Sequence, residues 1–138
     1  QRELPMNNFH LKIVSPDGCL YEGEAQLITL MTTQGEVSIL AHHTEYVASI
    51  GMGRATVVTE EGRRYGACIG GMLMVAENKV NIVATTFEWK EDIDVERAKA
   101  ALAYTEAELA KDGLDETRRT LLEAKKHRAK VRLAVAEN

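Results

Sequence analysis

The segment that decides the fold runs from residue 90 to residue 98 and reads Lys-Glu-Asp-Ile-Asp-Val-Glu-Arg-Ala. Before this acidic junction, apolar and polar residues alternate in short runs that glycine separates. After it, alanine and charged residues dominate, and glycine occurs once, at Gly113. Alternation with period 2 is typical of strands, and apolar residues three and four apart are typical of helices. We therefore expect a sheet domain followed by a helical arm.

Residues 8–90 carry the pattern of a small antiparallel sheet protein. Phe9, Leu11 and Ile13 alternate with His10 and Lys12, which predicts a strand with one buried face. Turn signals separate the later runs, at Pro16-Asp17-Gly18, Glu60-Glu61-Gly62 and Glu77-Asn78. Many short strands joined by tight turns indicate a β-sandwich or a flattened barrel.

Residues 91–138 predict two helices, near 92–111 and 115–136, joined as an antiparallel hairpin. Glycine just past a last turn is a usual helix stop, and Gly113 ends the first helix. Asp115 is then placed to cap the second helix. The first helix has an apolar seam at Val95, Ala98, Leu102, Thr105 and Leu109, and the second has a stripe at Leu121, Ala124, Val131 and Val135. Isolated helices of ~20 residues are marginal in water, so the seam must pack on its own hairpin, on the sheet domain or on another protein.

Length and composition exclude several classes of protein. No apolar run approaches the ~18 residues that span a bilayer. Cys19 and Cys68 are expected to be reduced core thiols rather than a disulfide framework. Residues 1–7 are expected to be disordered or vector-derived, with Met6 as the natural start.

The charge of the chain is unevenly distributed. The net charge is -4 and aromatics are 5% of residues, which argues against a general nucleic-acid binder. The segment 118–132 is nevertheless basic, because it contains seven cationic residues and one acidic residue, Glu123, which gives a local net charge of +6. That segment predicts either an acidic partner or a solvated helix face.

Four charged residues could form an anion site on the arm. Asp94 and Arg97 are three residues apart at a helix start, and Arg128 and Arg132 are four apart on the second helix, so each pair shares a face. An antiparallel hairpin brings these two helix ends together, next to a helix N-terminus that favours phosphates. The local alternative is that Asp94 only caps the helix and pairs with Arg97.

Other chemistry has little support in the sequence. His42, His43 and Glu45 resemble a metal set only superficially, because adjacent strand residues point to opposite faces. Gly70-Gly71 is not followed by a helix start, so we expect a bulge or positive φ at a sheet corner rather than a phosphate cradle. Neither a catalytic triad motif nor a P-loop is present, and we expect no enzyme and no metal.

Four segments resemble, in order and spacing, motifs of the epsilon subunit of bacterial F-type ATP synthases. Residues 35–43, Gly-Glu-Val-Ser-Ile-Leu-Ala-His-His, resemble the family's Gly-Glu-Leu/Ile-Gly-Ile-Leu-Pro-Gly-His. Residues 69–75, Ile-Gly-Gly-Met-Leu-Met-Val, resemble its Ser-Gly-Gly-Phe/Ile-Leu-Glu-Val. Residues 92–98 resemble its Ile/Leu-Asp-x-x-Arg-Ala nucleotide motif. Residues 128–133 resemble the basic C-terminal helix of the ATP-binding bacterial members.

This resemblance implies an α+β fold, with an antiparallel β-sandwich of about ten strands followed by the two-helix hairpin. It implies a non-catalytic rotor subunit of the central stalk, which couples ion flow through the membrane c ring to ATP synthesis in the F1 head. The implied partners are the gamma subunit, the c-subunit ring and the catalytic alpha/beta subunits, with no nucleic acid. The implied location is peripheral, on the cytoplasmic face of the bacterial membrane. The mobile hairpin would inhibit ATP hydrolysis, with ATP as a possible regulatory ligand and no required cofactor.

The resemblance also assigns roles to individual residues. Glu36 and His43 match positions that meet the c ring and gamma. The nucleotide positions are Glu88, Ile93, Asp94, Arg97, Arg128 and Arg132. The inhibitory basic helix would use Arg118, Arg119, Lys125, Lys126, Arg128, Lys130 and Arg132.

The chain departs from the family pattern at three places. Ala41-His42 replaces Pro-Gly, and Thr44-Glu45 replaces a small residue and proline. Tyr104 stands where some ATP-binding members carry another arginine.

Two alternatives lie outside this family. One is a stand-alone binding module whose basic hairpin docks on an acidic protein surface or on nucleic acid. Two observations separate it from the rotor subunit. The rotor subunit should copurify with gamma, whereas the stand-alone module should bind nucleic acid tightly and in a salt-sensitive way. The other is a small enzyme, which would need a convergent polar pocket.

Overall fold

The computed structural model describes residues 7–137. The chain divides into two compact units, Gln1–Trp89 and Lys90–Asn138. The first unit consists of strands and the second of helices. The prediction for residues 1–7 falls outside the described residues, apart from Asn7, which is exposed.

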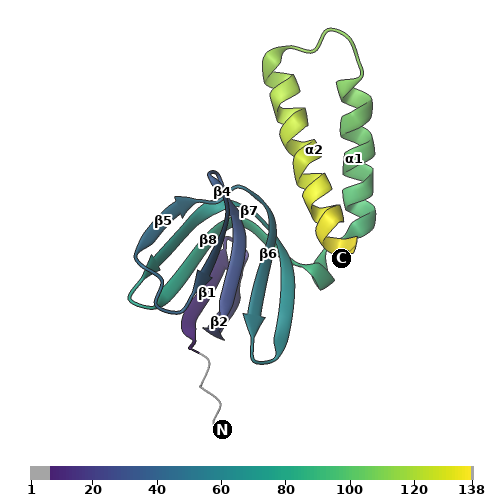
Figure 1. Cartoon of the computed structure of the whole chain (residues 1–138). Coiled ribbons are helices and arrows are strands. Elements are labelled where there is room, and N and C mark those ends of the chain that lie inside the picture. Colours follow the sequence, from purple (N-terminus) through teal and green to yellow (C-terminus); the bar gives the residue numbers. More distant parts are fainter. Residues whose placement is uncertain (1–6, 138) are drawn as a thin grey trace. The chain divides into compact units, whose positions relative to one another are not determined.

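Within the described residues, eight strands build the first unit, close to the ten expected, and the predicted fold class is confirmed (Figure 1). They are β1 (Phe9–Ser15), β2 (Gly18–Ala25), β3 (Leu27–Thr32), β4 (Gly35–Leu40), β5 (Tyr46–Ser49), β6 (Met52–Thr59), β7 (Gly62–Ala76) and β8 (Lys79–Trp89). Their order in the sheet is β2-β1-β8-β7-β6-β3-β4, with β5 paired to β7. The long strand β7 pairs with β6 along its first half and with β5 along its second half. One strand therefore takes part in both layers of the sandwich.

One pairing departs from the predicted antiparallel arrangement. β1 and β8 run parallel, from His10 beside Lys79 to Val14 beside Val83. All the other strand pairs are antiparallel. Hairpin signals cannot reveal this contact, because it joins the first and last strands of the unit across most of its length.

The interior of the unit is filled by the inward-facing residues of these strands. Leu11 and Ile13 from β1, Ile28 from β3 and Ile82 from β8 are fully buried in one core. Burying such a side chain contributes about 1.5–3 kcal/mol. Cys68 belongs to the same core, and burial raises the pKa of its thiol to about 12, which keeps it protonated. Both cysteines are free, but Cys19 is exposed, contrary to the expectation of two core thiols.

The glycine pair in β7 makes the change of pairing partner possible. Gly70 and Gly71 have φ of 73° and 117°, as the expected positive φ at a sheet corner requires. Their backbones pair across to the β5–β6 segment, since Gly70 N donates to Gly51 O and Ile50 N donates to Gly71 O, both at 2.8 Å. A Cβ added to Gly71 would overlap the carbonyl oxygen of Val83. Only glycine fits at this position.

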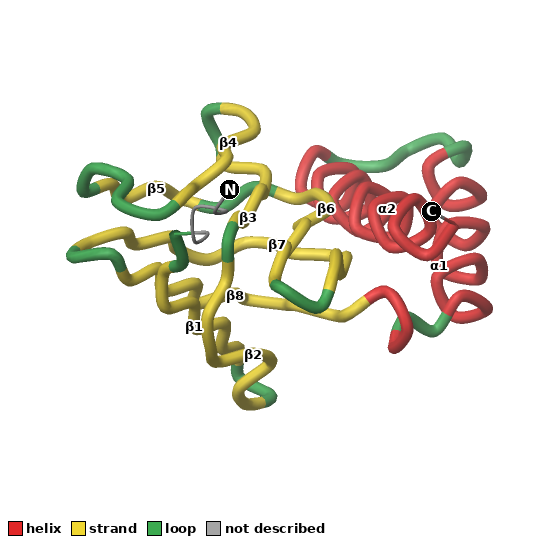
Figure 2. Tube along the Cα trace, turned by 60° about the horizontal axis from the view of Figure 1, so that its bottom comes forward, coloured by secondary structure: helices red, strands yellow, loops and turns green. Residues whose placement is uncertain are grey.

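The second unit consists of the short 3-10 helix η1 (Lys90–Asp92), α1 (Val95–Leu109) and α2 (Glu116–Glu137). These bounds lie within three residues of the predicted ones. Asp94 caps α1 by accepting a hydrogen bond from Arg97 N at 3.1 Å, and Asp115 accepts one from Arg118 N at 2.7 Å. Gly113 has φ of 81° in the connecting segment. Figure 2 shows α1 and α2 side by side, as the predicted hairpin requires.

The two helices pack through small residues. Ala98 and Thr105 of α1 are buried, and the Thr105 hydroxyl donates to Leu102 O at 3.0 Å. The buried residues of α2 are Leu122, Ala129, Val131 and Val135. The predicted stripe was wrong at Leu121, which is 61% exposed. Adjacent leucines differ by about 100° around a helix, and Leu122 takes the inward place.

The glycine at position 71 should be required for the stability of the sandwich. We expect Gly71→Ala to lower the free energy of unfolding by about 3 kcal/mol or more, because a steric clash adds to ~1–3 kcal/mol of backbone strain. Gly62→Ala is the matched control, since Gly62 has φ of 125° and open space around its Cβ position. Urea unfolding followed by Trp89 fluorescence measures both. Equal losses in the two variants would show that the clash at Val83 is not the cause.

Candidate functional site

The residues expected to meet the membrane ring, Glu36 and His43, lie on β4 and in the loop that follows it. β4 is the last strand in the sheet order, so one side of it is unpaired. Glu36 is exposed near the start of β4, and His43 is partly buried just beyond its end. Glu36 and Leu40 are four steps apart along the extended strand, on the order of 13 Å. The structure therefore keeps Glu36 and His43 apart, with Glu36 on the edge strand and His43 in the loop that follows it.

The loop from Ala41 to Glu45 has a defined conformation. His43 N donates to Leu40 O at 3.3 Å, and the His43 Nδ1 lies 2.7 Å from Thr44 O. The His43 and Tyr46 rings meet edge to face with centroids 5.8 Å apart. Leu40, at the entrance of the loop, is 58% exposed. This loop therefore presents an apolar side chain and an imidazole held in place by its neighbours.

The arm brings together most of the predicted nucleotide residues. Asp94 and Arg97 lie in the first turn of α1, and Arg128 and Arg132 lie toward the end of α2, which contacts η1 and packs antiparallel to α1. In Figure 1 the end of α2, marked C, lies beside the start of α1. Arg97 is exposed, whereas Arg128 and Arg132 are partly buried. Cationic groups at a helix N-terminus are suited to an anion.

The two remaining nucleotide residues have different surroundings. Ile93 is buried, with 8% of its surface exposed, and its amide donates to Lys90 O at 3.3 Å. Glu88 belongs to the sandwich unit, where it lies on β8 opposite Ala67. The arm by itself therefore supplies five of the six predicted positions.

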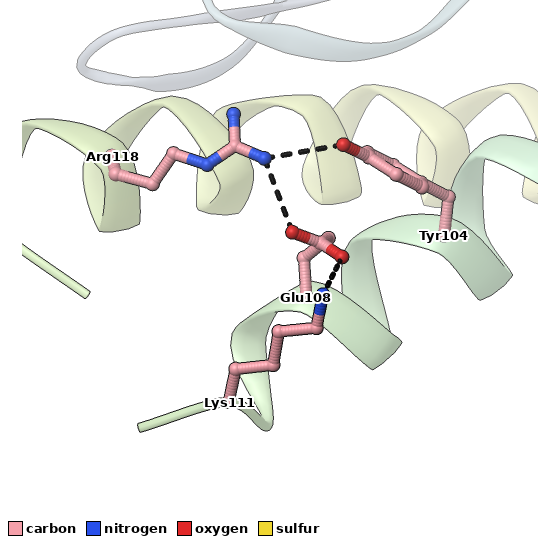
Figure 3. A network of polar contacts seen from close by, with 4 residues as sticks. All are labelled: Tyr104, Glu108, Lys111 and Arg118. Carbon is pink, nitrogen blue, oxygen red and sulfur yellow. Dashed lines mark hydrogen bonds and ion pairs between the residues drawn. The ribbon is translucent and has the colours of Figure 1, made fainter. Parts of the chain in front are cut away.

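The basic segment of α2 is partly engaged within the hairpin itself. Arg118 Nη2 donates to the Tyr104 hydroxyl at 3.1 Å and to Glu108 Oε1 at 3.3 Å, which joins the start of α2 to α1 (Figure 3). Lys111 Nζ donates to Glu108 Oε2 at 2.6 Å. We call Tyr104, Glu108, Lys111 and Arg118 the hairpin cluster. Lys125 Nζ adds a cation–π contact, 5.1 Å from the centre of the Tyr104 ring.

The cluster changes the acidity of its carboxyl group. Hydrogen bonds from Lys111 and then from Arg118 lower the pKa of Glu108 below its ordinary value. A carboxyl group with a lowered folded-state pKa stabilises the fold above its unfolded pKa, and this contribution is lost as pH falls through the folded value. The Lys111 and Arg118 side chains are exposed and that of Glu108 is 20% exposed, so solvent and salt screen part of the effect.

One hollow in the sandwich unit is unsuited to a nucleotide. It has a volume of about 220 Å³ between the end of β2 and the β6–β7 turn, and its lining includes Glu24, Glu60 and Glu61. Burial, and next the carboxylate of Glu61, raise the pKa of Tyr21 in its wall. Three carboxylates repel phosphates, so the arm is the better candidate for an anion.

The sandwich also presents an apolar outer face. Met72 of β7 pairs with Val83 of β8, and Val47 of β5 pairs with Met74 of β7, so these side chains share the face opposite the core. Val47 is 65% exposed, Val83 46% and Met72 39%. Contiguous exposed apolar residues mark a surface that a partner covers.

Comparison with known proteins identifies the family. Residues 8–90 match the family model of the ATP synthase delta/epsilon chain, beta-sandwich domain. The chain belongs to the ATP synthase delta/epsilon chain family. It is 38% identical over 133 residues to the ATP synthase epsilon chain of Staphylococcus aureus strain JH9, across 96% of this chain and 98% of that relative. The epsilon chain of strain Newman has the same identity and coverage.

Two solved structures share the fold. One is the mitochondrial ATP synthase of Euglena gracilis, OSCP/F1/c-ring in rotational state 1, with a TM-score of 0.82, 24% identity, and coverage of 100% of this chain and 86% of that one. The other is the central stalk and c ring of the Tetrahymena thermophila mitochondrial ATP synthase, with a TM-score of 0.67, 11% identity, and coverage of 92% and 95%. The family predicted from four sequence motifs is confirmed.

Sequence reasoning missed the hairpin cluster, although its spacing was visible. Tyr104 and Glu108 are four residues apart, and Glu108 and Lys111 are three apart, so each pair shares a helix face. The contact with Arg118 depends on how the two helices align, which the sequence alone does not specify. No group of three or more histidine, cysteine or acidic residues within residues 7–137 could hold a metal ion. In the same range, none of the helices has the length and apolar character that a membrane crossing needs.

Removing the carboxylate of the hairpin cluster should weaken the pairing of the two helices. We expect Glu108→Gln to lower the thermal midpoint of the helical signal at 222 nm. In wild type this midpoint should also fall as pH drops below the carboxyl's ordinary pKa of 4.5, and the contribution of Glu108 to that fall should be absent from the variant. The difference should shrink in high salt. Glu106→Gln is the matched control, an equal charge change on an exposed residue of α1. Identical behaviour of the two variants would contradict a specific role for Glu108.

Proposed function

We propose that the chain is the non-catalytic central-stalk subunit of a bacterial F-type ATP synthase, and that it couples the membrane ring to the catalytic head. The observation that carries this proposal is its 38% identity to a bacterial epsilon chain over 133 residues, a range that includes both the sandwich and the hairpin. Its position would be peripheral to the membrane, on the cytoplasmic face, held there through the complex. Its partners would be gamma, the c ring and the alpha/beta subunits.

The sandwich unit offers two separate surfaces for the rotor partners. The apolar outer face around Val47, Met72 and Val83 suits a permanent contact with gamma, because covering apolar area favours stable association. The β4 edge with Glu36, and the loop with His43, suit the c ring. This division gives the unit a firm attachment on one surface and a polar contact on another.

The arm would carry regulation. In the paired hairpin, Arg118 and Lys125 are engaged by Tyr104 and Glu108. An acidic surface on the alpha/beta subunits would compete for these cations when the hairpin opens, and the basic helix would then block rotation in the hydrolysis direction. ATP bound at the start of α1 and the end of α2 would favour the paired hairpin, provided that it binds this state more tightly.

A stand-alone basic binding module is the rival proposal. It predicts tight, salt-sensitive binding to nucleic acid or to an acidic protein, without gamma. Affinity purification of the chain from its own cells tests both, because the rotor subunit should copurify with gamma at moderate salt. Recovery of nucleic acid without gamma would overturn the rotor assignment.

Glu36 should matter for coupling and not for folding. It is exposed on an edge strand, so Glu36→Ala should change the thermal midpoint by less than about 4 °C. Losing a contact worth about 0.5–1.4 kcal/mol should weaken binding to the membrane ring by roughly two- to tenfold, and the ratio of ions pumped to ATP hydrolysed should fall in reconstituted complexes. Glu22→Ala, an exposed strand glutamate on β2, is the control. A fall in midpoint of about ten degrees or more would instead give Glu36 a structural role.

Arg128 should contribute to ATP binding. Charge-assisted hydrogen bonds contribute about 1.5–3 kcal/mol, so Arg128→Ala should weaken ATP binding about ten- to a hundredfold in calorimetry, with the melting of the sandwich unchanged. Arg119→Ala removes a cation at the opposite end of the hairpin and should leave the affinity unchanged. Absence of binding heat for wild type at millimolar ATP would remove ATP as the regulatory ligand.

A further inference from the structure

One asparagine connects three segments of the sandwich unit that are far apart in the sequence. The Asn78 Oδ1 accepts a hydrogen bond from His42 N at 2.7 Å, and its Nδ2 donates one to Asn8 O at 2.9 Å. Its own backbone carbonyl accepts from His10 N at 3.2 Å. Asn78 therefore joins the β7–β8 turn to the beginning of β1 and to the loop between β4 and β5.

Both ends of the Asn78 amide are used, and only one orientation satisfies them. A flipped amide would place the NH₂ group against the His42 N–H and the oxygen against the Asn8 carbonyl. Asn78 is also partly buried, whereas Glu77 beside it is exposed. An amide fixed by one donor and one acceptor is a rigid attachment point.

The loop that Asn78 contacts contains a strained residue. His42 has φ of 64°, in the left-handed region that residues with a Cβ rarely adopt. Strained residues persist where surrounding interactions over-determine them. The bond from His42 N to Asn78 Oδ1 is such an interaction, because it fixes the amide of the strained residue itself.

The position of His43 depends on this conformation. His43 follows His42 directly, its amide closes a turn onto Leu40 O, and its ring packs on Tyr46. If His42 left the left-handed region, the chain direction would change at the residue before the imidazole. The exposed Leu40 would then no longer lie at a fixed distance from the ring.

We propose that Asn78 is a positioning residue that sets the conformation of the 41–45 loop and thereby orients His43 toward the membrane ring. The ring contact itself rests on the function proposed above. Asn78 would not touch the ring. It would act through the His42 amide, from a turn that is 36 residues away in the sequence.

Two substitutions separate this role from a general contribution to stability. Asn78→Gly keeps a residue that tolerates the φ of 62° at this position and removes both side-chain bonds. Asn78→Asp keeps an acceptor for His42 N but loses the donor to Asn8 O, so it should lower the thermal midpoint while preserving the loop. Glu77→Gly is the matched control, at a neighbouring position with φ of 54° and an exposed side chain.

Amide hydrogen exchange of the whole chain and ion pumping by the reconstituted complex are the two measurements. In Asn78→Gly the His42 amide should exchange about five- to tenfold faster, the factor expected for the loss of one hydrogen bond. The pumping ratio should fall at unchanged subunit occupancy. Glu77→Gly and Asn78→Asp should match wild type in both, although Asn78→Asp melts earlier. A purely structural role predicts instead that pumping follows the thermal midpoint across the four proteins.

The failures of the two proposals can be told apart. Unchanged His42 exchange in Asn78→Gly overturns the positioning role directly. Faster exchange without loss of pumping also overturns it, if His43→Ala does lower pumping. If neither Asn78→Gly nor His43→Ala changes pumping, the loop does not meet the ring, and the proposed function of this loop is overturned together with the role of Asn78.

Discussion

The close approach of the Gly71 backbone to the Val83 carbonyl is the contact on which the sandwich depends. It lets β7 run for 15 residues and pair with β6 before the glycines and with β5 after them. β8 follows β7 along this path, with Ile69 opposite Thr86 and Gly71 opposite Ala84. Because two long strands cross from one layer to the other, the layers share a single core and cannot separate independently.

This construction leaves the outer surfaces available for partners. The core residues of β7 and β8 point inward, so the alternate residues Met72 and Val83 point outward and remain exposed. β4 ends the sheet order, and its unpaired side carries Glu36. A protein that must contact two neighbours in a rotating assembly needs such separate surfaces on a body that does not deform, and the shared core supplies that rigidity.

The sequence predicted the parts of this structure that depend on local patterns. Helix bounds follow from Asp94, Gly113 and Asp115, since capping and stop signals act within one turn. The parallel contact of β1 with β8 was not predictable, because it joins segments about 70 residues apart. Spacing alone could not predict which of Leu121 and Leu122 faces inward, because the rotation of α2 about its own axis depends on its packing against α1. The candidate site divides in the same way: Asp94 with Arg97, and Arg128 with Arg132, could be grouped because each pair lies within about one helix turn, whereas Asn78 and the hairpin cluster depend on tertiary contacts.

The packing of the two helices bears on the regulation proposed for the arm. Apart from Leu122, its buried residues are alanine, valine and a satisfied threonine, which bury little apolar area per residue. Contacts of modest strength, such as Arg118 with Tyr104 and Glu108, therefore add to the stability of the paired helices. In this chain Tyr104 accepts from an arginine of α2. The paired state is therefore stabilised from within, by the same cations that the proposed inhibitory helix would present to its acidic partner. In the proposed mechanism, pairing and inhibition would compete for one set of charges, and a ligand that binds the paired state more tightly would shift the balance toward pairing.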